Sequence, residues 1–202
     1  MSLLLALHSS SPVLGVGVLD LEDPDQAPQV AAFELGRGLS NQLLACIEEL
    51  LPAQRWPTLA RLAVATGPGG FTGTRLTVVL ARTLAQQLQL PLDGISSFAL
   101  IAARCGISEP TWLCQTLPRR GVVAGLYGPD PAAPGQVLEQ QAPRLFAADA
   151  ELPAGPQLDA EVRLPADVQQ LLAFSAARAA AGDGAAPWQS VLPLYPTSPV
   201  AC

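Results

Sequence analysis

The sequence predicts an α/β protein built around a mixed β-sheet, and three observations lead to that prediction. Short apolar runs, typical of buried strands, alternate with segments whose apolar residues recur at helical spacing. Three strand-like runs come first and strand–helix units follow. Half of the 202 residues are hydrophobic and only 14% are charged, which excludes intrinsic disorder and allows one large domain or two small ones.

The first three strands are expected at 3–7, 13–19 and 29–35. Residues 8–12 (HSSSP) are typical of a tight polar turn, and residues 21–28 contain two prolines before the third strand. Three successive strands joined by turns most simply form an antiparallel meander.

A change to helical spacing then predicts the first helix, with Ser40 as its N-cap and Pro52 as its stop. One face of this helix carries Leu43, Leu44, Ile47, Leu50 and Leu51. We expect a loop at 52–58 and a buried strand at 61–66.

The glycine-rich turn 67–70 leads into a second helix that ends near Leu88, with Thr72 or Thr74 as its cap. Its core stripe is expected to contain Leu76, Val79, Leu80, Leu84 and Leu88. A short strand at 91–95 and a third helix follow. The third helix is capped by Ser96 or Ser97 and ends at Gly106.

The resulting order is β-β-β-α-β-α-β-α over about the first 105 residues. A β-α-β crossover places its strands in parallel, so the meander and the later strands together give a mixed sheet. This order is that of RNase H-like folds and of one lobe of the actin-like ATPases.

The second half is less regular, and residues 142–165 have no clear assignment. The remaining segments are predicted to be a hairpin of strands 112–117 and 121–127, a loop at 128–135, a strand at 136–140, a helix at 166–181 and an extended tail at 187–196 packed on the core.

Composition excludes several classes of site. The chain has no lysine, so a Schiff-base lysine, a P-loop lysine and an SxxK nucleophile are absent. His8 is the only histidine, which excludes catalytic or zinc sites that need two. The net charge of −6 argues against this chain alone binding the phosphate backbone of a nucleic acid.

No signal peptide or membrane-spanning run is recognisable, so a cytoplasmic protein is expected. The four cysteines lack CxxC spacing and are expected to be buried free thiols in a reducing compartment. They are Cys46, Cys105, Cys114 and Cys202.

The glycine-rich segment before the second helix has two interpretations. Its backbone N–H groups and the helix N-terminus could face an anion, or the glycines could form a tight structural turn. Neither P-loop nor Rossmann spacing is present, and spacing alone favours the structural turn. The candidate nucleotide or anion residues are Gly67, Gly69, Gly70, Thr72, Gly73 and Arg75.

The string GPGGFTGTR, an apolar helix and then LPLDGISSFALIA resemble the TsaB (YeaZ) family. The resemblance covers residues 1–105 clearly and the remainder more weakly. The matching residues are Gly67, Pro68, Gly69, Phe71, Thr72, Gly73, Arg75, Ala81, Leu84, Ala85, Gly94, Ser96 and Ala99.

The resemblance implies an actin-like (ASKHA) fold of two lobes, at 1–106 and 107–202. It implies a non-catalytic subunit in the synthesis of threonylcarbamoyladenosine in tRNA. This subunit would pair with a TsaD-like transferase, support its activity and support the recruitment of a TsaE-like ATPase. The complex would use ATP and Mg²⁺, whereas this chain itself would bind no cofactor tightly. The chain would contact tRNA only as part of the complex. For the chain alone, the sequence leaves two states open, a homodimer and a monomer.

The alternative is an autonomous ASKHA nucleotide-binding protein or ATPase that uses the Gly67–Gly73 loop. The family's first strand often ends in an aspartate that holds Mg²⁺ and phosphate in active relatives, whereas here Leu7-His8-Ser9-Ser10 stands there. A neutral imidazole cannot replace a hard oxygen ligand for Mg²⁺, so nucleotide hydrolysis is not expected. One histidine and no HExxH argue against a metallopeptidase.

The second helix is apolar on more than one face, which predicts a partner helix packed on it. The expected interface residues are Val78, Ala81, Arg82 and Ala85 of this helix with Asn41, Ala45 and Glu48 of the first. Arg75 lies in the first turn, where a cation is unfavourable to the helix dipole, so a specific partner or anion is expected. Arg119 and Arg120 are expected at a solvated hairpin tip.

Overall fold

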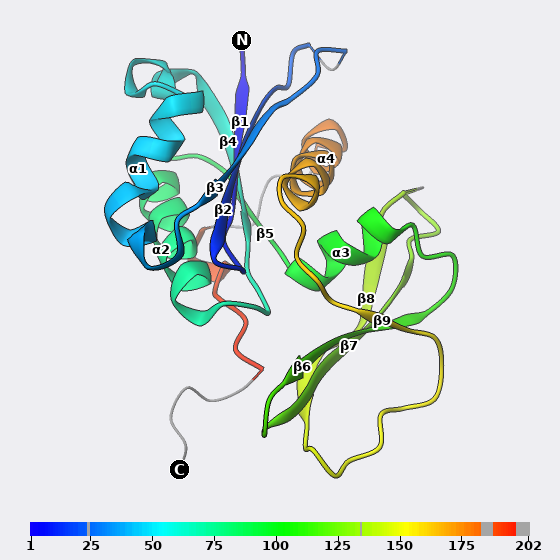
Figure 1. The fold of residues 1–202 in the computed structure, drawn as a ribbon. Helices are drawn as coiled ribbons and strands as arrows, with labels where there is room; N and C mark the ends of the chain where they lie inside the picture. The colour runs from blue at the N-terminus through cyan, green and yellow to red at the C-terminus, as the bar shows by residue number, and fades with distance from the viewer. Residues whose placement is uncertain (24, 134, 183–187, 197–202) are drawn as a thin grey trace.

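The computed structural model describes residues 1–23, 25–133, 135–182 and 188–196, which form two lobes that each contain one sheet (Figure 1). The sheet of the first lobe has the strand order β3-β2-β1-β4-β5. Its strands are β1 (Leu3–His8), β2 (Val13–Asp20), β3 (Gln29–Glu34), β4 (Leu59–Ala65) and β5 (Leu92–Ile95).

β1, β2 and β3 pair antiparallel, and β4 and β5 run parallel to β1. The predicted meander, the mixed sheet and the β-β-β-α-β-α-β-α order are therefore confirmed. Because β1, β4 and β5 are parallel, their carboxyl ends meet at one edge of the sheet, where the loops before the helices also lie.

Helices cover both faces of this sheet (Figure 1). α1 (Leu39–Leu50) and α2 (Phe71–Leu88) lie on one face, and α4 (Ala166–Ala180) lies on the other. Alternate residues of β1 enter two separate cores, with Leu5 facing α1 and α2, and Leu4 facing α4. A strand buried on both faces must be apolar throughout, which explains the run LLLAL.

The buried face of α2 differs from the predicted leucine stripe. Val78, Ala81 and Ala85 are almost completely buried, whereas Val79 is 52% exposed and Leu88 is also exposed. Small side chains let α2 lie close over the sheet, so its longer leucines flank the contact. The prediction that Val78, Ala81 and Ala85 lie on an outer face is therefore wrong.

The helix caps also differ in detail. α1 begins after Gly38 with no side-chain cap, so Ser40 lies inside its first turn. α2 begins after Gly70, and neither Thr72 nor Thr74 caps it. Ser96 does precede α3 (Ser97–Cys105), but its hydroxyl makes no cap bond. The expected loop at 52–58 contains the short 3₁₀ helix Ala53–Thr58.

The second lobe contains a mixed sheet with the order β8-β7-β6-β9. β6 (Thr111–Leu117) and β7 (Gly121–Pro129) form the predicted hairpin. β8 (Val137–Phe146) is longer than predicted, and β9 (Gln157–Asp159) pairs in parallel with β6 inside the region that had no assignment.

The C-terminal helix and tail return to the first lobe. α4 packs against β1, β2 and β4, and the buried Val191 joins the core between the first sheet and α2. The Leu194 amide donates to the Thr66 carbonyl at 2.7 Å. The division of the chain at residue 106 therefore describes the two sheets, while α4 and the tail pack with the first of them.

Three of the cysteines lie within the described residues, and all three are free thiols. Cys46 and Cys114 are buried as expected, whereas Cys105 at the end of α3 is exposed. Cys202 lies outside the described residues.

Candidate functional site

The glycine-rich turn between β4 and α2 lies at the carboxyl edge of the first sheet. Gly67 and Gly69 have φ values of 95° and 154°, a region that L side chains rarely adopt. The Gly70 amide donates to the Ser10 carbonyl at 2.7 Å, and the Ser97 amide donates to the Gly67 carbonyl at 2.7 Å. The turn is therefore tied both to the β1–β2 turn and to the start of α3.

Two glycines of this turn are needed for close backbone packing. A Cβ atom at Gly69 would overlap the carbonyl group of Ser10, and one at Gly73 would overlap the carbonyl oxygen of Ser9. Gly70 differs, because its nearest neighbouring atom would lie at 3.6 Å. These contacts support the structural-turn interpretation of Gly69 and Gly73.

Buried hydroxyl groups fill the space between the turn and β1. The Oγ atoms of Ser10 and Ser97 are 2.7 Å apart, and Thr74 Oγ1 donates to Ser10 Oγ at 3.2 Å. Ser9 Oγ and Thr77 Oγ1 form a second hydrogen bond of 2.9 Å. Each hydroxyl therefore has a partner within the chain, and together they fix the approach of α2 to β1.

His8 ends β1 in the position where the resemblance expects an aspartate. It is fully buried, and this burial lowers the pKa of the imidazole to about 3, so the side chain is neutral at physiological pH. Its Nδ1 accepts a long hydrogen bond of 3.4 Å from the Ser10 amide. A buried neutral imidazole beside self-satisfied hydroxyls does not fit a Mg²⁺–phosphate group.

The remaining candidate loop residues are at the surface. Thr72 is exposed in the first turn of α2, and Arg75 is exposed at the start of the next turn. Gly70, Thr72 and Gly73 line a depression of about 500 Å³ between the starts of α1 and α2, which Arg37 and Phe71 also line. The glycines thus lie together, but Arg75 does not line this depression.

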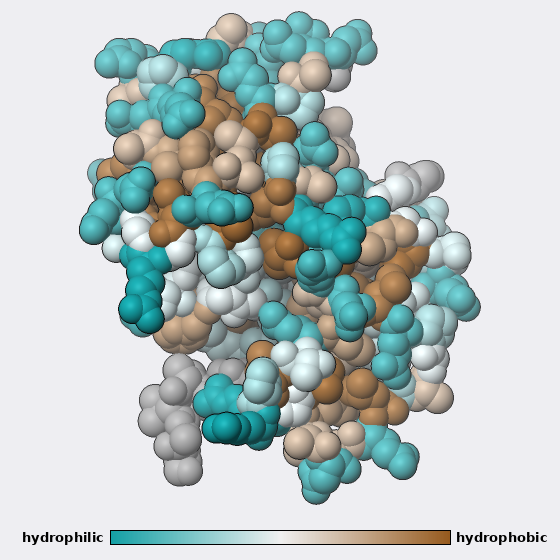
Figure 2. Space-filling model, viewed as in Figure 1, coloured by the Kyte–Doolittle hydropathy of each residue, from teal (hydrophilic) through white to brown (hydrophobic). Residues whose placement is uncertain are grey.

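The outer side of α1 and α2 combines polar and apolar side chains. Asn41, Ala45 and Glu48 are exposed on α1, as predicted. Leu44 is 50% exposed beside them, and Val79 is its counterpart on α2. Figure 2 shows hydrophobic side chains gathered over the first lobe, with hydrophilic residues along its upper edge.

Arg82 is only partly available on that side. It is half-buried, and its guanidinium lies 5.5 Å from the centre of the Trp188 ring. A stacked guanidinium retains its charge while its flat face covers the ring. Arg82 therefore links α2 to the tail.

A buried ionic cluster surrounds Asp93 of β5, and it was not among the sites predicted from the sequence. Its carboxylate accepts bonds from Arg61 Nε at 2.7 Å, from Ser175 Oγ at 2.5 Å and from Arg178 at 3.3 Å. Arg61, Asp93 and Arg178 line a cavity of about 710 Å³. The usable signal was a single charged residue within each of two apolar strand runs.

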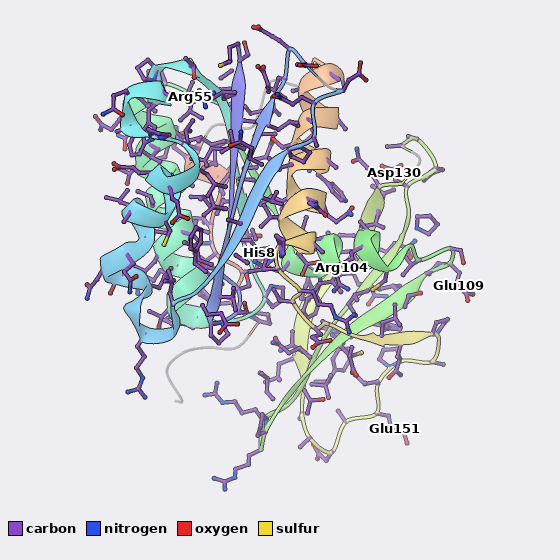
Figure 3. The ribbon with its side chains drawn as sticks, turned by 45° about the horizontal axis from the view of Figure 1, so that its top comes forward. His8, Arg55, Arg104, Glu109, Asp130 and Glu151 are labelled. Atoms are coloured by element: carbon purple, nitrogen blue, oxygen red, sulfur yellow. The ribbon has the colours of Figure 1, made fainter. Side chains whose placement is uncertain are left out.

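Polar contacts link the start of α3 to the second lobe and the end of α3 to α4. The buried Tyr127 of β7 hydrogen-bonds to Ser96 and to Glu139, each at 2.9 Å. Arg104 of α3 pairs with the buried Asp167 of α4 at 2.6 Å, and Figure 3 shows Arg104 beside the junction of the lobes. Burial raises the pKa of the Asp167 carboxyl despite this pairing.

Comparison with known proteins gives a consistent picture. The sequence pattern of the family described as TsaD, tRNA N6-adenosine threonylcarbamoyltransferase, matches residues 28–120. The curated Bacillus subtilis protein "tRNA threonylcarbamoyladenosine biosynthesis protein TsaB" is 34% identical over 131 residues. That match covers 61% of this chain and 54% of the relative, so the chain spans about half the length of the curated relative that it matches.

Solved structures match over almost the whole chain. YeaZ from Pseudomonas aeruginosa superimposes with a TM-score of 0.74 and 22% identity, over 96% of this chain and all of that one. A second structure, of a protein with similarity to peptidase YeaZ from P. aeruginosa, gives 0.76 and 21%, over 98% of this chain and all of that one. At such identity these matches establish the fold, the two-lobed actin-like arrangement that the sequence resemblance implies.

Two features are absent from the described residues. None of the helices within 1–23, 25–133, 135–182 and 188–196 is both long and apolar enough to cross a membrane. Over the same ranges, no group of three or more His, Cys, Asp and Glu side chains is placed to hold a metal ion.

Proposed function

We propose that the chain is a divergent member of the TsaB/YeaZ family and takes part in the synthesis of threonylcarbamoyladenosine in tRNA. In this proposal it is a non-catalytic subunit that pairs with a TsaD-like transferase and supports its activity. The transferase and a TsaE-like ATPase supply the chemistry and use ATP and Mg²⁺.

One observation carries the non-catalytic part of the proposal. At the end of β1, where an active relative would need a hard oxygen ligand, this chain has the buried neutral His8 and hydroxyls that bond to one another. This arrangement supports a non-catalytic role, because these side chains do not offer the hard oxygen ligand that Mg²⁺ would need at the end of β1.

The proposed contact with the transferase is the outer side of α1 and α2. Ala45, Asn41 and Glu48 of α1 and Val79 of α2 are exposed on it, and Leu44 adds apolar surface. Small and apolar residues allow the close approach of two more helices, while Asn41 and Glu48 can form hydrogen bonds at the rim. Val79 replaces the buried Val78, Ala81 and Ala85 in this assignment.

The test is co-purification with the TsaD-like transferase of the same organism. Ala45→Glu would place an unpaired charge in the buried contact. We expect the dissociation constant of the complex to increase at least tenfold, equivalent to a loss of about 1.4 kcal/mol or more in binding free energy. Val79→Glu should act in the same direction. In cells, both variants should lower the threonylcarbamoyladenosine content of tRNA.

The matched control is Ala177→Glu, an identical change on the exposed side of α4. It should leave the association unchanged, and all three variants should retain the far-UV circular dichroism of the parent chain. Association that survives Ala45→Glu and Val79→Glu would refute this surface. A chain that never co-purifies with the transferase and never affects tRNA modification would refute the function.

The alternative is an autonomous nucleotide-binding protein or ATPase that uses the Gly67–Gly73 loop. Calorimetry with ATP and Mg²⁺ distinguishes this alternative from a non-catalytic subunit. We expect no tight binding and no turnover by the isolated chain. Tight binding with hydrolysis would overturn the non-catalytic assignment.

A further inference from the structure

The cavity of about 710 Å³ follows β5, which is an edge strand of the first sheet. Three of the four residues of β5 line it, together with Arg178 and Gly182 at the end of α4, Glu139 of β8 and four residues of the tail. Val191 of the tail packs in the core with α2, whereas α4 packs in the core on the other face of the sheet. The cavity is therefore a groove along the open edge of β5, with walls from both faces.

The backbone of β5 can accept another strand at this edge. The carbonyl groups of Pro91 and Ile95 accept hydrogen bonds from β4 at 2.9 Å each. In a parallel ladder every second residue bonds to the same neighbour, so Leu92 and Gly94 direct their N–H and C=O groups away from β4. Both residues line the groove, and Gly94 is partly exposed. An extended chain laid in the groove would find backbone partners there.

Arg178 supplies a cation that the buried ion pair does not need. Arg61 already bonds both carboxylate oxygens of Asp93, from Nε at 2.7 Å and from Nη2 at 3.2 Å. Arg178 reaches the same carboxylate at 3.3 Å, which is its one hydrogen bond within the described residues, and its side chain is 42% exposed. Its remaining N–H groups are available to a second carboxylate in the groove.

An acidic side chain lies further along the same groove. Glu139 is exposed and accepts a hydrogen bond from the Tyr127 hydroxyl, which in turn bonds Ser96 just after β5. Arg178 lies at the level of Asp93, three residues earlier in the chain. At about 3.3 Å per residue, the two charges are separated by about 10 Å along the groove. A molecule that pairs with both is elongated and carries both signs of charge.

Thr66 gives independent evidence that the groove holds a polar molecule. It is only 6% exposed and lines the groove where β4 ends. Its hydroxyl makes no hydrogen bond with any residue in the part of the chain that the structure describes. A hydroxyl removed from bulk water is costly without a partner, so it favours a polar group in the groove.

We propose that this groove, lined by Asp93, Gly94, Glu139 and Arg178, binds an extended peptide segment of a partner protein as an added strand beside β5. The segment has one carboxylate that pairs with Arg178 and one Lys or Arg side chain that pairs with Glu139. Side chains two residues apart lie on one face of an extended chain, about 7 Å apart, and the length of the basic side chain covers the remaining distance.

Two features favour a peptide over a small zwitterion. The ammonium and carboxylate groups of a free amino acid are bonded to one carbon atom, too close together to meet Arg178 and Glu139 at once. Only a polypeptide offers the row of backbone groups that matches the open edge of β5. The inference goes beyond the proposed function, since none of the described residues that line the groove belongs to α1 or α2.

Fluorescence anisotropy on the full chain tests the proposal. The probe is a labelled pool of acetylated, amidated seven-residue peptides with Glu and Lys fixed two positions apart and Thr, Val or Ser elsewhere. A second pool has the two charges in the reverse order, because the added strand can run in either direction. A third pool has Gln at both positions. One charged order should bind about tenfold more tightly than the Gln pool, at about threefold per exposed charge pair.

Paired changes in protein and peptide locate the contacts. Arg178→Gln should weaken the charged pool about threefold and have no effect once the peptide Glu is Gln. Glu139→Gln should behave in the same way toward the peptide Lys. The matched control is Arg163→Gln, because Arg163 is also exposed and paired with an acid but does not line the groove. It should leave the affinity unchanged.

Backbone N-methylation of the bound peptide tests the added strand. It should weaken binding at every second position only, since one edge of the peptide faces β5. Losses without this alternation would overturn the proposal, as would equal affinity for the charged and Gln pools or equal effects of Arg178→Gln and Arg163→Gln. Free glutamate or lysine that binds as tightly as the pool would show a small-molecule site and would also overturn it.

Discussion

Replacing Gly69 by alanine tests the physical basis of the turn that precedes α2. The added Cβ would overlap the backbone of Ser10, and φ is 154°. Left-handed strain costs about 1–2 kcal/mol, and overpacking a fixed contact costs about 1–3 kcal/mol. We therefore expect a loss of about 3 kcal/mol in the free energy of unfolding.

Gly70→Ala is the adjacent control. Its φ is −57° and the nearest atom would lie at 3.6 Å, so the change should stay within about 0.5 kcal/mol. Urea unfolding with an unchanged slope measures both variants. In a chain of 202 residues, the loss expected for Gly69→Ala corresponds to a fall in Tm of about 6–12 °C.

Gly73→Ala separates packing from helix propensity. Alanine in place of glycine within a helix stabilises it by about 1 kcal/mol when nothing else changes. Here the new Cβ would overlap the Ser9 carbonyl and disturb the hydrogen bond between Ser9 and Thr77. We expect net destabilisation by about 1–2 kcal/mol. A Gly73→Ala variant that is more stable than the parent, or a Gly69→Ala variant that matches Gly70→Ala, would refute this explanation of the turn.

Two further predictions concern buried charge. Asp93→Asn removes the buried carboxylate that both Arg61 and Arg178 contact, so it should cost about 3–5 kcal/mol in urea unfolding. The exposed Glu161→Gln should leave the unfolding transition nearly unchanged, and similar losses in the two variants would contradict the role of burial. Because the folded chain lowers the His8 pKa to about 3, the unfolded chain binds this proton more readily, and stability should fall by up to about 1.4 kcal/mol per pH unit as pH drops from about 6.5 towards 3. The NMR resonance of this single imidazole should not shift between pH 8 and 5, and a normal titration midpoint near 6.5 would show that His8 is not buried as described.

Much of the fold could be predicted because local patterns specify it. The apolar runs of β1 and β2, the helical spacing before Pro52 and the turn at Pro118–Arg120 all lie where expected. The second half of β8 could not be predicted, because almost every residue of that edge strand is exposed and it shows no apolar alternation. β9 is too short and too exposed to leave a pattern.

Less of the candidate site than of the fold could be predicted from the sequence. Hydrophobicity selects leucines for the core stripe of α2, but the separation between helix and sheet is set by Ala81 and Ala85, which only the tertiary structure shows. The hydroxyl cluster joins Ser10 to Ser97 across 87 positions of the chain, so no local motif contains it. The single imidazole in place of an aspartate, by contrast, was visible in the sequence.

The return of α4 and the tail to the first sheet affects how the protein is made. Ribosomes release the strands β1–β5 long before residues 166–194, yet Leu4 and Ala6 are covered by α4 and Thr66 is bonded to Leu194. The nascent first lobe would therefore emerge with one side of its sheet uncovered. It can complete its core only after synthesis has passed the second lobe, so early termination within α4 should yield an aggregation-prone fragment in place of a smaller folded domain.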